Sequence, residues 1–373
     1  MATHERKEGE SFSEWLLVEL NQAYLEARRG RRGDVEVHEF EVNEIENLIN
    51  LRDAILSRSY KPGRGVAFVI RKPVLREIFA APFRDKIVHH FLVNVSREWW
   101  DRRMLADAYA CRFQKGSKIG ILRAEKNMRR VSRNFREEAF VIKLDLQGYF
   151  LSIPRTKVLE KMIWGLDRQF PEKEELYRTM KFLWEETLLD EPAKNVTRKG
   201  SPRDWRELPR SKSLFNQPKG KGIVIGNLSS QFVANIYLDS LDRFVTGDLG
   251  YKYYGRYVDD FYIMIPERRY EKAKADVVEI EKFLDGMELK LHPTKRYYQN
   301  IKNGFEFLGV VIYPGRVVPG KRVKAGFREA VRDFSSGRGK EEAIVSYLGF
   351  MKNINGRKAT EKIFREVGWD FDF

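Results

Sequence analysis

The sequence contains very little cysteine and no long apolar run. Cys111 is the only cysteine among 373 residues, so an intramolecular disulfide and a cysteine-rich zinc site are both excluded. No uninterrupted apolar stretch of about 18 residues occurs, and the N-terminus, MATHERKEGESFSEW, has no apolar core of the signal-peptide type. We therefore expect a cytoplasmic protein that is neither secreted nor inserted in a membrane.

Acidic residues are outnumbered by basic ones. The 69 Lys and Arg residues exceed the 54 Asp and Glu residues, which gives a net charge of +15. This balance favours a polyanionic partner, most commonly nucleic acid; the alternative is a basic protein whose charge serves only solubility. The length and the 42% hydrophobic content are sufficient for the cores of two or three domains.

Three aspartates lie at the ends of predicted strands. The segment KYYGRYVDDFYIMI (252–265) predicts a hairpin with Asp259 and Asp260 at its tip, and FVIKL (140–144) predicts a buried strand followed by Asp145. Acids at the edge of a core need a counter-charge, usually a divalent metal ion; the alternative is that they only cap turns. Three such carboxylates can hold two Mg²⁺ ions roughly 3.5–4 Å apart, as nucleotidyl transfer requires.

The order of several motifs resembles that of reverse transcriptases. REIFAAPFRDKIVHHFL and AYACRFQKGSKIGI are similar to the two fingers motifs, and FEFLGVVI (305–312), which predicts a strand, is similar to the primer grip. The resemblance covers residues 66–355. It implies an α+β, right-hand polymerase fold with fingers, an antiparallel-sheet palm and a small helical thumb.

We expect four parts along the chain, and apolar residues at three- to four-residue intervals predict helices within residues 10–60 and 155–189. They are an N-terminal helical extension (1–60), fingers with part of the palm (61–138), the palm (139–313) and a helical thumb (314–373). Inside the palm, residues 190–222 are rich in proline, lysine and arginine. This composition predicts a long basic insertion that is either functional or disordered.

The resemblance implies a set of catalytic residues. Asp145, Asp259 and Asp260 would bind two Mg²⁺ ions, with Mn²⁺ as a substitute, and Lys295 would protonate the pyrophosphate leaving group. From the sequence alone, Lys295 is equally compatible with a surface charge or a phosphate contact.

The resemblance also implies a set of nucleotide-binding residues. They are Arg76, Arg84, Phe150, Ile225, Gly226, Gln231 and Tyr257.

Their expected roles differ. Arg76 and Arg84 would contact the triphosphate or template, and the alternative is exposed strand charges. Phe150 would exclude a 2′-hydroxyl, and the alternative is a core aromatic. Gly226 would let the backbone approach a ligand, and Ser229 or Ser230 would cap the next helix.

Two segments indicate a particular kind of reverse transcriptase. IGNLSSQ (225–231) and SYLGFMKN (346–353) are similar to the enzymes of diversity-generating retroelements, whose cDNA synthesis is error-prone at template adenines. Most reverse transcriptases have Gln at the position of Ile225 and Pro at that of Gln231. Losing a polar side chain at position 225 would weaken the rejection of mispairs.

This resemblance implies several partners. They are an RNA template, a DNA or RNA primer, deoxynucleoside triphosphates and a small basic oligomeric accessory variability protein, in a bacterial, archaeal or phage-encoded system. The alternatives are an antiviral-defence or retron-type reverse transcriptase, or a nucleic-acid-binding scaffold that has lost catalysis.

Overall fold

The computed structural model describes residues 8–72, 74–172 and 174–369. The first seven residues, part of the segment that lacks signal-peptide character, lie outside the described residues. None of the described helices is both long enough and apolar enough to span a membrane.

The chain forms two compact units, each built from two stretches of sequence. The first unit combines residues 1–104 with 148–240, and the second combines residues 105–147 with 241–373. The predicted division into fingers, palm and thumb remains a prediction.

The first unit is mainly helical. Helix α1 (Phe12–Ala27) begins with a capping box, because the Ser11 hydroxyl accepts from the Glu14 N–H at 3.2 Å and the Glu14 carboxylate accepts from the Ser11 N–H at 2.9 Å. Its apolar face packs on helix α4 (Phe83–Asp101). The helices predicted between residues 10 and 60 and between 155 and 189 are confirmed. The other helices are α2 (Val35–Val42), α3 (Glu44–Leu56), α6 (Tyr149–Ser152), α7 (Arg155–Gln169), α8 (Glu175–Leu189) and α10 (Leu228–Tyr237).

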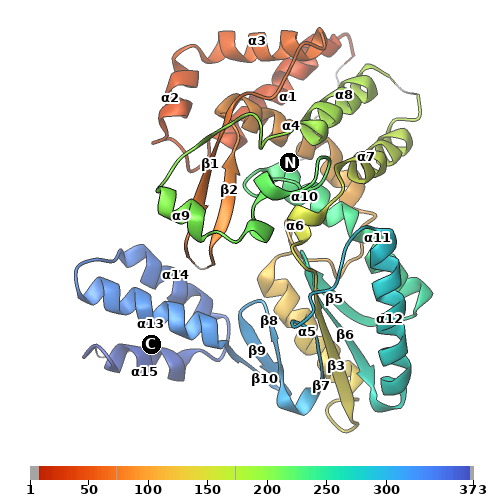
Figure 1. The fold of residues 1–373 in the computed structure, drawn as a ribbon, viewed down its shortest axis with the longest axis vertical. Helices are drawn as coiled ribbons and strands as arrows, with labels where there is room; N and C mark the ends of the chain where they lie inside the picture. The colour runs from red at the N-terminus through yellow and green to blue at the C-terminus, as the bar shows by residue number, and fades with distance from the viewer. Residues whose placement is uncertain (1–7, 73, 173, 370–373) are drawn as a thin grey trace. The chain divides into compact units, whose positions relative to one another are not determined.

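A small sheet completes the first unit (Figure 1). Strand β1 (Gly65–Ile70) pairs antiparallel with β2 (Arg76–Ala80) and parallel with β4 (Val196–Arg198). Strand β4 belongs to the predicted insertion 190–222, so this segment has ordered structure. Its other elements are helix α9 (Pro202–Glu207) and two short 3₁₀ helices, η1 (Arg210–Lys212) and η2 (Leu214–Asn216).

The second unit is built on a four-stranded antiparallel sheet in the order β5-β6-β3-β7. Helix α5 packs on one face through a cluster that includes Val141, Tyr262 and Met264, and helix α12 contacts β6 (Figure 1). The elements are α5 (Ser117–Val131), β3 (Ala139–Asp145), α11 (Asp239–Arg243), η3 (Phe244–Asp248), β5 (Tyr253–Tyr257), β6 (Asp260–Pro266), η4 (Glu267–Arg269), α12 (Tyr270–Gly286), β7 (Tyr297–Asn300) and η5 (Ile301–Asn303).

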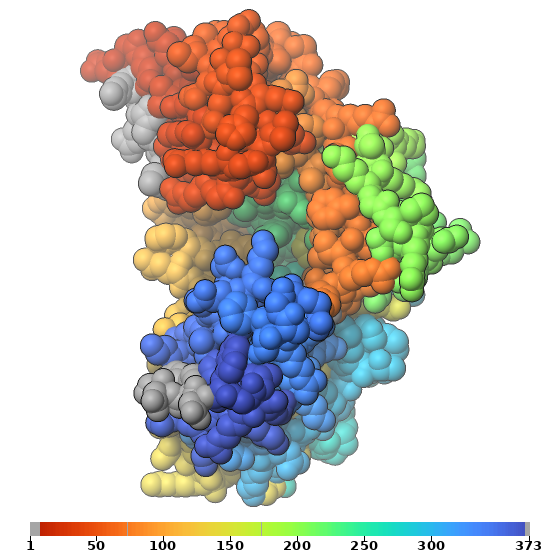
Figure 2. Space-filling view, turned by 90° about the vertical axis from the view of Figure 1, so that its left-hand side faces the viewer, coloured from red at the N-terminus to blue at the C-terminus, as the bar shows by residue number. Residues whose placement is uncertain are grey.

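A second sheet and three helices follow in this unit. The sheet has the order β10-β9-β8, and the helices pack around Phe327, Val331 and Met351. Figure 2 shows these C-terminal helices, in blue, side by side on the visible face. The elements are β8 (Phe305–Phe307), β9 (Val310–Tyr313), β10 (Arg316–Pro319), α13 (Lys321–Ser335), α14 (Glu341–Lys352) and α15 (Arg357–Arg365).

The prediction of a single strand over residues 305–312 is wrong. Leu308 and Gly309 have φ values of +53° and +82°, and this pair of positive values turns the chain between β8 and β9. The segment is therefore a hairpin, as in the primer grip that it resembles. The predicted mixture of helices with an antiparallel sheet is confirmed.

Candidate active site

The central strand pair of the second unit positions two of the predicted catalytic acids. Strand β3 is buried along most of its length, and Asp145 is its last residue, at the point where burial decreases. In the antiparallel register, Asp145 lies directly opposite Asp260, the first residue of β6. Two carboxylates thus stand on neighbouring strands at the same end of the sheet. Residues directly opposite each other in an antiparallel pair have Cβ atoms about 5 Å apart.

The third acid lies in the turn that joins β5 to β6. Tyr257 pairs with Asp260, so Val258 and Asp259 form a two-residue hairpin loop. The predicted hairpin is confirmed, but only Asp259 lies in its loop, because Asp260 is already the first residue of β6. The Leu146 N–H donates to the Asp259 carbonyl at 3.2 Å. This bond ties the turn to the residue that follows Asp145, so the three aspartates share one end of the sheet.

Two lysines accompany these acids. Lys295 Nζ lies 3.2 Å and 3.4 Å from the two carboxylate oxygens of Asp145. Lys143 is buried and contacts the Asp260 carboxylate. Burial lowers the pKa of the Lys143 ammonium to about 7, although the carboxylates of Asp145 and Asp259 oppose this shift.

Sequence reasoning did not identify Lys143. The available signal was a charged residue within the otherwise apolar strand FVIKL, two positions before Asp145. Because side chains alternate along a strand, Lys143 and Asp145 point to the same face.

A cavity of about 440 Å³ opens beside these residues within the second unit. It is lined by Asp145, Asp260 and both lysines, and also by the β8–β9 hairpin and the start of α13. The segment predicted to be the primer grip therefore borders the acids. Tyr257, at the end of β5, is half-buried, and burial raises its pKa.

The acids provide the donor chemistry that Mg²⁺ prefers, since it binds hard carboxylate oxygens. Asp145 and Asp260 line one cavity with side-chain exposures of 18% and 30%, so a small ion can reach them. Among the residues that the structure describes, no three His, Cys, Asp or Glu side chains are grouped closely enough to hold a metal ion. Lysine ammonium groups contact two of the carboxylates.

The remaining nucleotide-binding candidates lie in the first unit. Arg76 is exposed at the start of β2, Gln231 is exposed in α10, and Phe150 is half-buried in α6. Arg84 lies at the start of α4, where its guanidinium donates to the Lys61 carbonyl at 2.6 Å and to the Asp85 carboxylate at 3.3 Å. These intramolecular contacts leave 43% of the Arg84 side chain exposed.

Ile225 and Gly226 lie against strand β2. The Ile225 carbonyl accepts from the Phe79 N–H at 2.8 Å. Gly226 has a φ of +136°, and a Cβ atom at this position would lie 2.2 Å from the Phe79 carbonyl oxygen. The close approach that requires glycine here is therefore made by the protein's own backbone.

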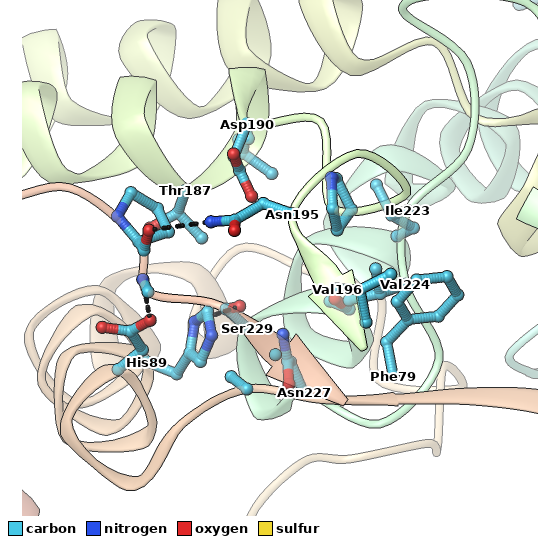
Figure 3. A pocket seen from close by; sticks show the side chains of 18 of the residues that line it. Phe79, His89, Thr187, Asp190, Asn195, Val196, Ile223, Val224, Asn227 and Ser229 are labelled. Carbon is cyan, nitrogen blue, oxygen red and sulfur yellow. Dashed lines mark hydrogen bonds between the residues drawn. The ribbon is translucent and has the colours of Figure 1, made fainter. Parts of the chain in front are cut away.

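The prediction that Ser229 or Ser230 caps the next helix is wrong. Helix α10 begins at Leu228, before either serine, and Asn227 occupies the capping position without a side-chain bond. Ser229 instead forms a 2.9 Å hydrogen bond with His89 Nδ1, and both residues line a cavity of about 70 Å³, shown in Figure 3. Burial lowers the pKa of His89 to about 4, so its imidazole is neutral at pH 7.

Known proteins similar to this chain include a protein family and a solved structure. Residues 75–312 match the family described as "Reverse transcriptase (RNA-dependent DNA polymerase)". Among solved structures, a telomerase from Candida albicans in complex with a fragment of telomeric RNA has a similar fold, with a TM-score of 0.50 and 12% sequence identity. The match covers 83% of this chain and 54% of the telomerase chain, so the present chain spans about half the length of that protein. No curated protein sequence matches the chain.

Proposed function

Because the chain belongs to the reverse transcriptase family and is thus an RNA-directed DNA polymerase, we propose that it is the polymerase of a diversity-generating retroelement. In this role it would copy a template RNA into error-prone cDNA for mutagenic retrohoming. The observation that supports its catalytic centre best is the register of β3 and β6, which sets Asp145 opposite Asp260 beside the turn that contains Asp259.

The proposed centre uses Asp145, Asp259 and Asp260 to hold divalent metal ions, which members of this family use. When bound, Mg²⁺ supplies Lewis-acid stabilisation of the attacking and leaving oxygens during phosphoryl displacement. The three carboxylates set the position and charge of the centre. Lys295 is exposed next to Asp145, where it is placed to donate a proton to the departing pyrophosphate.

Lys143 has a different role in this proposal. Its ammonium group lies beneath the acids and balances part of their charge from inside the sheet. Two or three carboxylates confined to one end of a buried strand pair repel one another, and a nearby cation reduces that repulsion.

The proposed nucleotide contacts come from several segments. Arg76 and Arg84 would bind the triphosphate or the template, and Phe150 would pack against the deoxyribose and exclude a 2′-hydroxyl. Ile225, Gly226 and Gln231 would lie beneath the templating pair, and Tyr257 would lie near the primer end.

A basic groove between α13 and α15 supports binding of the template–primer backbone. It has a volume of about 480 Å³ and is lined by five basic side chains. Arg328 is paired with Glu366 at 2.6 Å, but the four lysines have no ion-pair partner in the part of the chain that the structure describes. Lys321 also lines the catalytic cavity, so the groove continues from the proposed reaction centre. The groove lysines are Lys321, Lys324, Lys358 and Lys362.

The retroelement assignment rests on the segments 225–231 and 346–353. A partner RNA containing the template and a small basic accessory protein would complete the system. Binding of structured RNA is also in keeping with the fold similarity to a telomerase whose structure contains telomeric RNA. A retron-type or antiviral-defence reverse transcriptase is the second candidate, since the family match alone fits it equally well.

Primer extension on an RNA template with Mg²⁺ tests the catalytic centre. We expect the wild-type protein to incorporate deoxynucleotides and Asp259→Asn to lose about 100-fold or more of this rate, because an essential charge is removed from the site. Equally low incorporation by both proteins would reject the proposed centre and favour a scaffold without catalysis.

Sequencing of the extension products tests the retroelement type. In the presence of the flanking retroelement RNA, we expect misincorporation concentrated at template adenines, and we expect Ile225→Gln to reduce it by restoring a polar contact at the nascent pair. Uniformly distributed errors in the wild-type products would favour the retron-type alternative. An unchanged error pattern in Ile225→Gln would show that this side chain is not the cause.

A further inference from the structure

A fully buried ion pair lies behind the catalytic turn. Arg256, in β5, and Asp242, in α11, both have side chains with 0% exposure. The Arg256 Nε donates to Asp242 Oδ1 at 2.7 Å and its Nη2 donates to Oδ2 at 2.6 Å. The Tyr254 hydroxyl adds a third bond to Oδ1 at 2.6 Å. Burying two charges requires compensating contacts of this quality, and such a pair is weak evidence of stabilisation, so its geometry points to another role.

The same guanidinium also reaches the turn. Arg256 Nη1 donates to the Val258 carbonyl at 3.0 Å. The main chain of Arg256 is fixed as well, because its N–H donates to the Asp107 carbonyl and its carbonyl accepts from the Tyr109 N–H, both at 2.9 Å. Arg256 is therefore a rigid donor aimed at the peptide that joins Val258 to Asp259.

The conformation of this turn is unfavourable for its sequence. Val258 has a φ of +56°, whereas Asp259 is not among the described non-glycine residues with positive φ. A positive φ at the first central residue alone is the pattern of a type II′ turn, which favours glycine at that position. Val258 is β-branched, so it is strained in this region.

The alternative, a type I′ turn, would point the Asp259 side chain in a different direction. A type I′ turn has positive φ at both central residues, and the two types differ in the orientation of the central peptide, whose carbonyl is that of Val258. A flip of this peptide changes φ at Asp259 and therefore the direction of its side chain. The hydrogen bond from Arg256 holds the carbonyl in the observed orientation.

We propose that Arg256, fixed by Asp242, is a positioning residue that selects the type II′ turn and thereby aims Asp259 at the reaction centre. This inference rests on the proposed function, because it assigns the aim of a catalytic carboxylate. In this proposal, Asp242 orients the Arg256 guanidinium. The hydrogen bond from Arg256 to the Val258 carbonyl then opposes the peptide flip that would relieve the backbone strain at Val258.

Arg256→Lys tests the inference, because lysine keeps the charge beside Asp242 but cannot bind both Asp242 and the Val258 carbonyl with a planar fork. We expect kcat for primer extension to fall by about 10- to 100-fold, since a shift of about 1 Å in a reacting group has an effect of that size. We also expect the Mg²⁺ concentration for half-maximal activity to rise. KM for deoxynucleotide and affinity for template–primer should change by less than about 3-fold, because the mutation does not alter the contacts that bind the substrates in the ground state.

A matched control and a rescue separate this role from simple destabilisation. Tyr254→Phe removes one bond to Asp242 but leaves the Arg256–Val258 bond, so its kcat should stay within about 3-fold of wild type. Val258→Gly removes the strain of the type II′ turn, so the Arg256→Lys loss should be smaller in the Val258→Gly background, as a double-mutant cycle would measure.

Three outcomes are informative. An active wild type with an equally active Arg256→Lys variant would overturn the inference while leaving the proposed function intact. A loss that is as large in the Val258→Gly background would overturn it as well, since turn strain would then be irrelevant. An inactive wild-type protein would instead reject the proposed function. Circular dichroism and template–primer binding confirm that each variant is folded.

Discussion

Two lysines with different exposure neutralise the acids of the candidate active site. Lys295 has a side chain that is 54% exposed, so it can leave Asp145 when a ligand arrives. Lys143 is buried in the sheet and has no such freedom. An exposed, mobile ammonium group suits proton delivery, whereas the fixed Lys143, whose pKa burial lowers to about 7, balances the charge of the acids only while it is protonated. The two lysines are therefore not interchangeable.

Phe150 offers a test of sugar selection at the scale of one residue. Its carbonyl accepts from the Ile223 N–H at 2.8 Å, which anchors its backbone, and its ring is only half-buried. We expect Phe150→Ala to admit ribonucleotides, lowering the discrimination in kcat/KM between deoxynucleotides and ribonucleotides by about 10-fold or more, because the bulk that excludes a 2′-hydroxyl is removed. Single-nucleotide extension with matched pairs of nucleotides measures this ratio.

Leu151, the next residue in α6, provides a control for Phe150→Ala. It is also half-buried and is not among the proposed nucleotide contacts, so Leu151→Ala should leave the ratio unchanged. Unaltered selectivity in Phe150→Ala would assign the ring to packing alone.

At the scale of elements, the sequence predicted the parts that depend on local pattern. Runs of aromatic and β-branched residues identified β3 and the β5–β6 hairpin, and helical periodicity identified the helices of residues 10–60 and 155–189. The sequence predicted that the three acids would meet, but not the antiparallel register that sets Asp145 opposite Asp260, because pairing between strands distant in sequence leaves no local signal.

The errors at this scale have physical causes. The apolar run 305–312 was predicted as one strand because its hydrophobicity continues through Leu308 and Gly309, where the backbone has positive φ. Ser229 was expected to cap α10, but it forms a tertiary bond with buried His89. Arg256 and Lys143 were not predicted as site residues, because the role of a charged residue within a strand depends on its buried partner, which the sequence does not reveal.

At the scale of the whole molecule, the net charge of +15 does not specify where nucleic acid binds. Many basic side chains are paired with acids on the surface, as Lys274 is with Glu271 and Lys282 with Glu279, and such pairs attract a polyanion only weakly. The groove between α13 and α15 differs because none of its four lysines forms an ion pair among the described residues, although Lys362 is near enough to Glu366 to add to the effect of Arg328, whose hydrogen bond lowers the pKa of that carboxyl group. Concentrated positive charge of this kind releases counterions when phosphate binds.

The groove therefore gives a prediction with a matched control. We expect replacement of Lys324, Lys358 and Lys362 by Gln to weaken template–primer binding and to make the slope of log K against log[salt] shallower by about 0.7–0.9 for each phosphate that is no longer neutralised. Fluorescence anisotropy across a salt series measures both quantities.

The control removes the same charge elsewhere in the second unit. Lys274, Lys282 and Lys302 are exposed and each is paired with a glutamate, so their replacement by Gln lowers the net charge equally without touching the groove. We expect this control to keep most of the affinity and the wild-type salt slope. If both triple variants lost affinity to the same extent, binding would depend on overall charge, and the groove would have no special role. If only the groove variant lost affinity, the surface that begins at the catalytic cavity with Lys321 would be the path of the template–primer backbone.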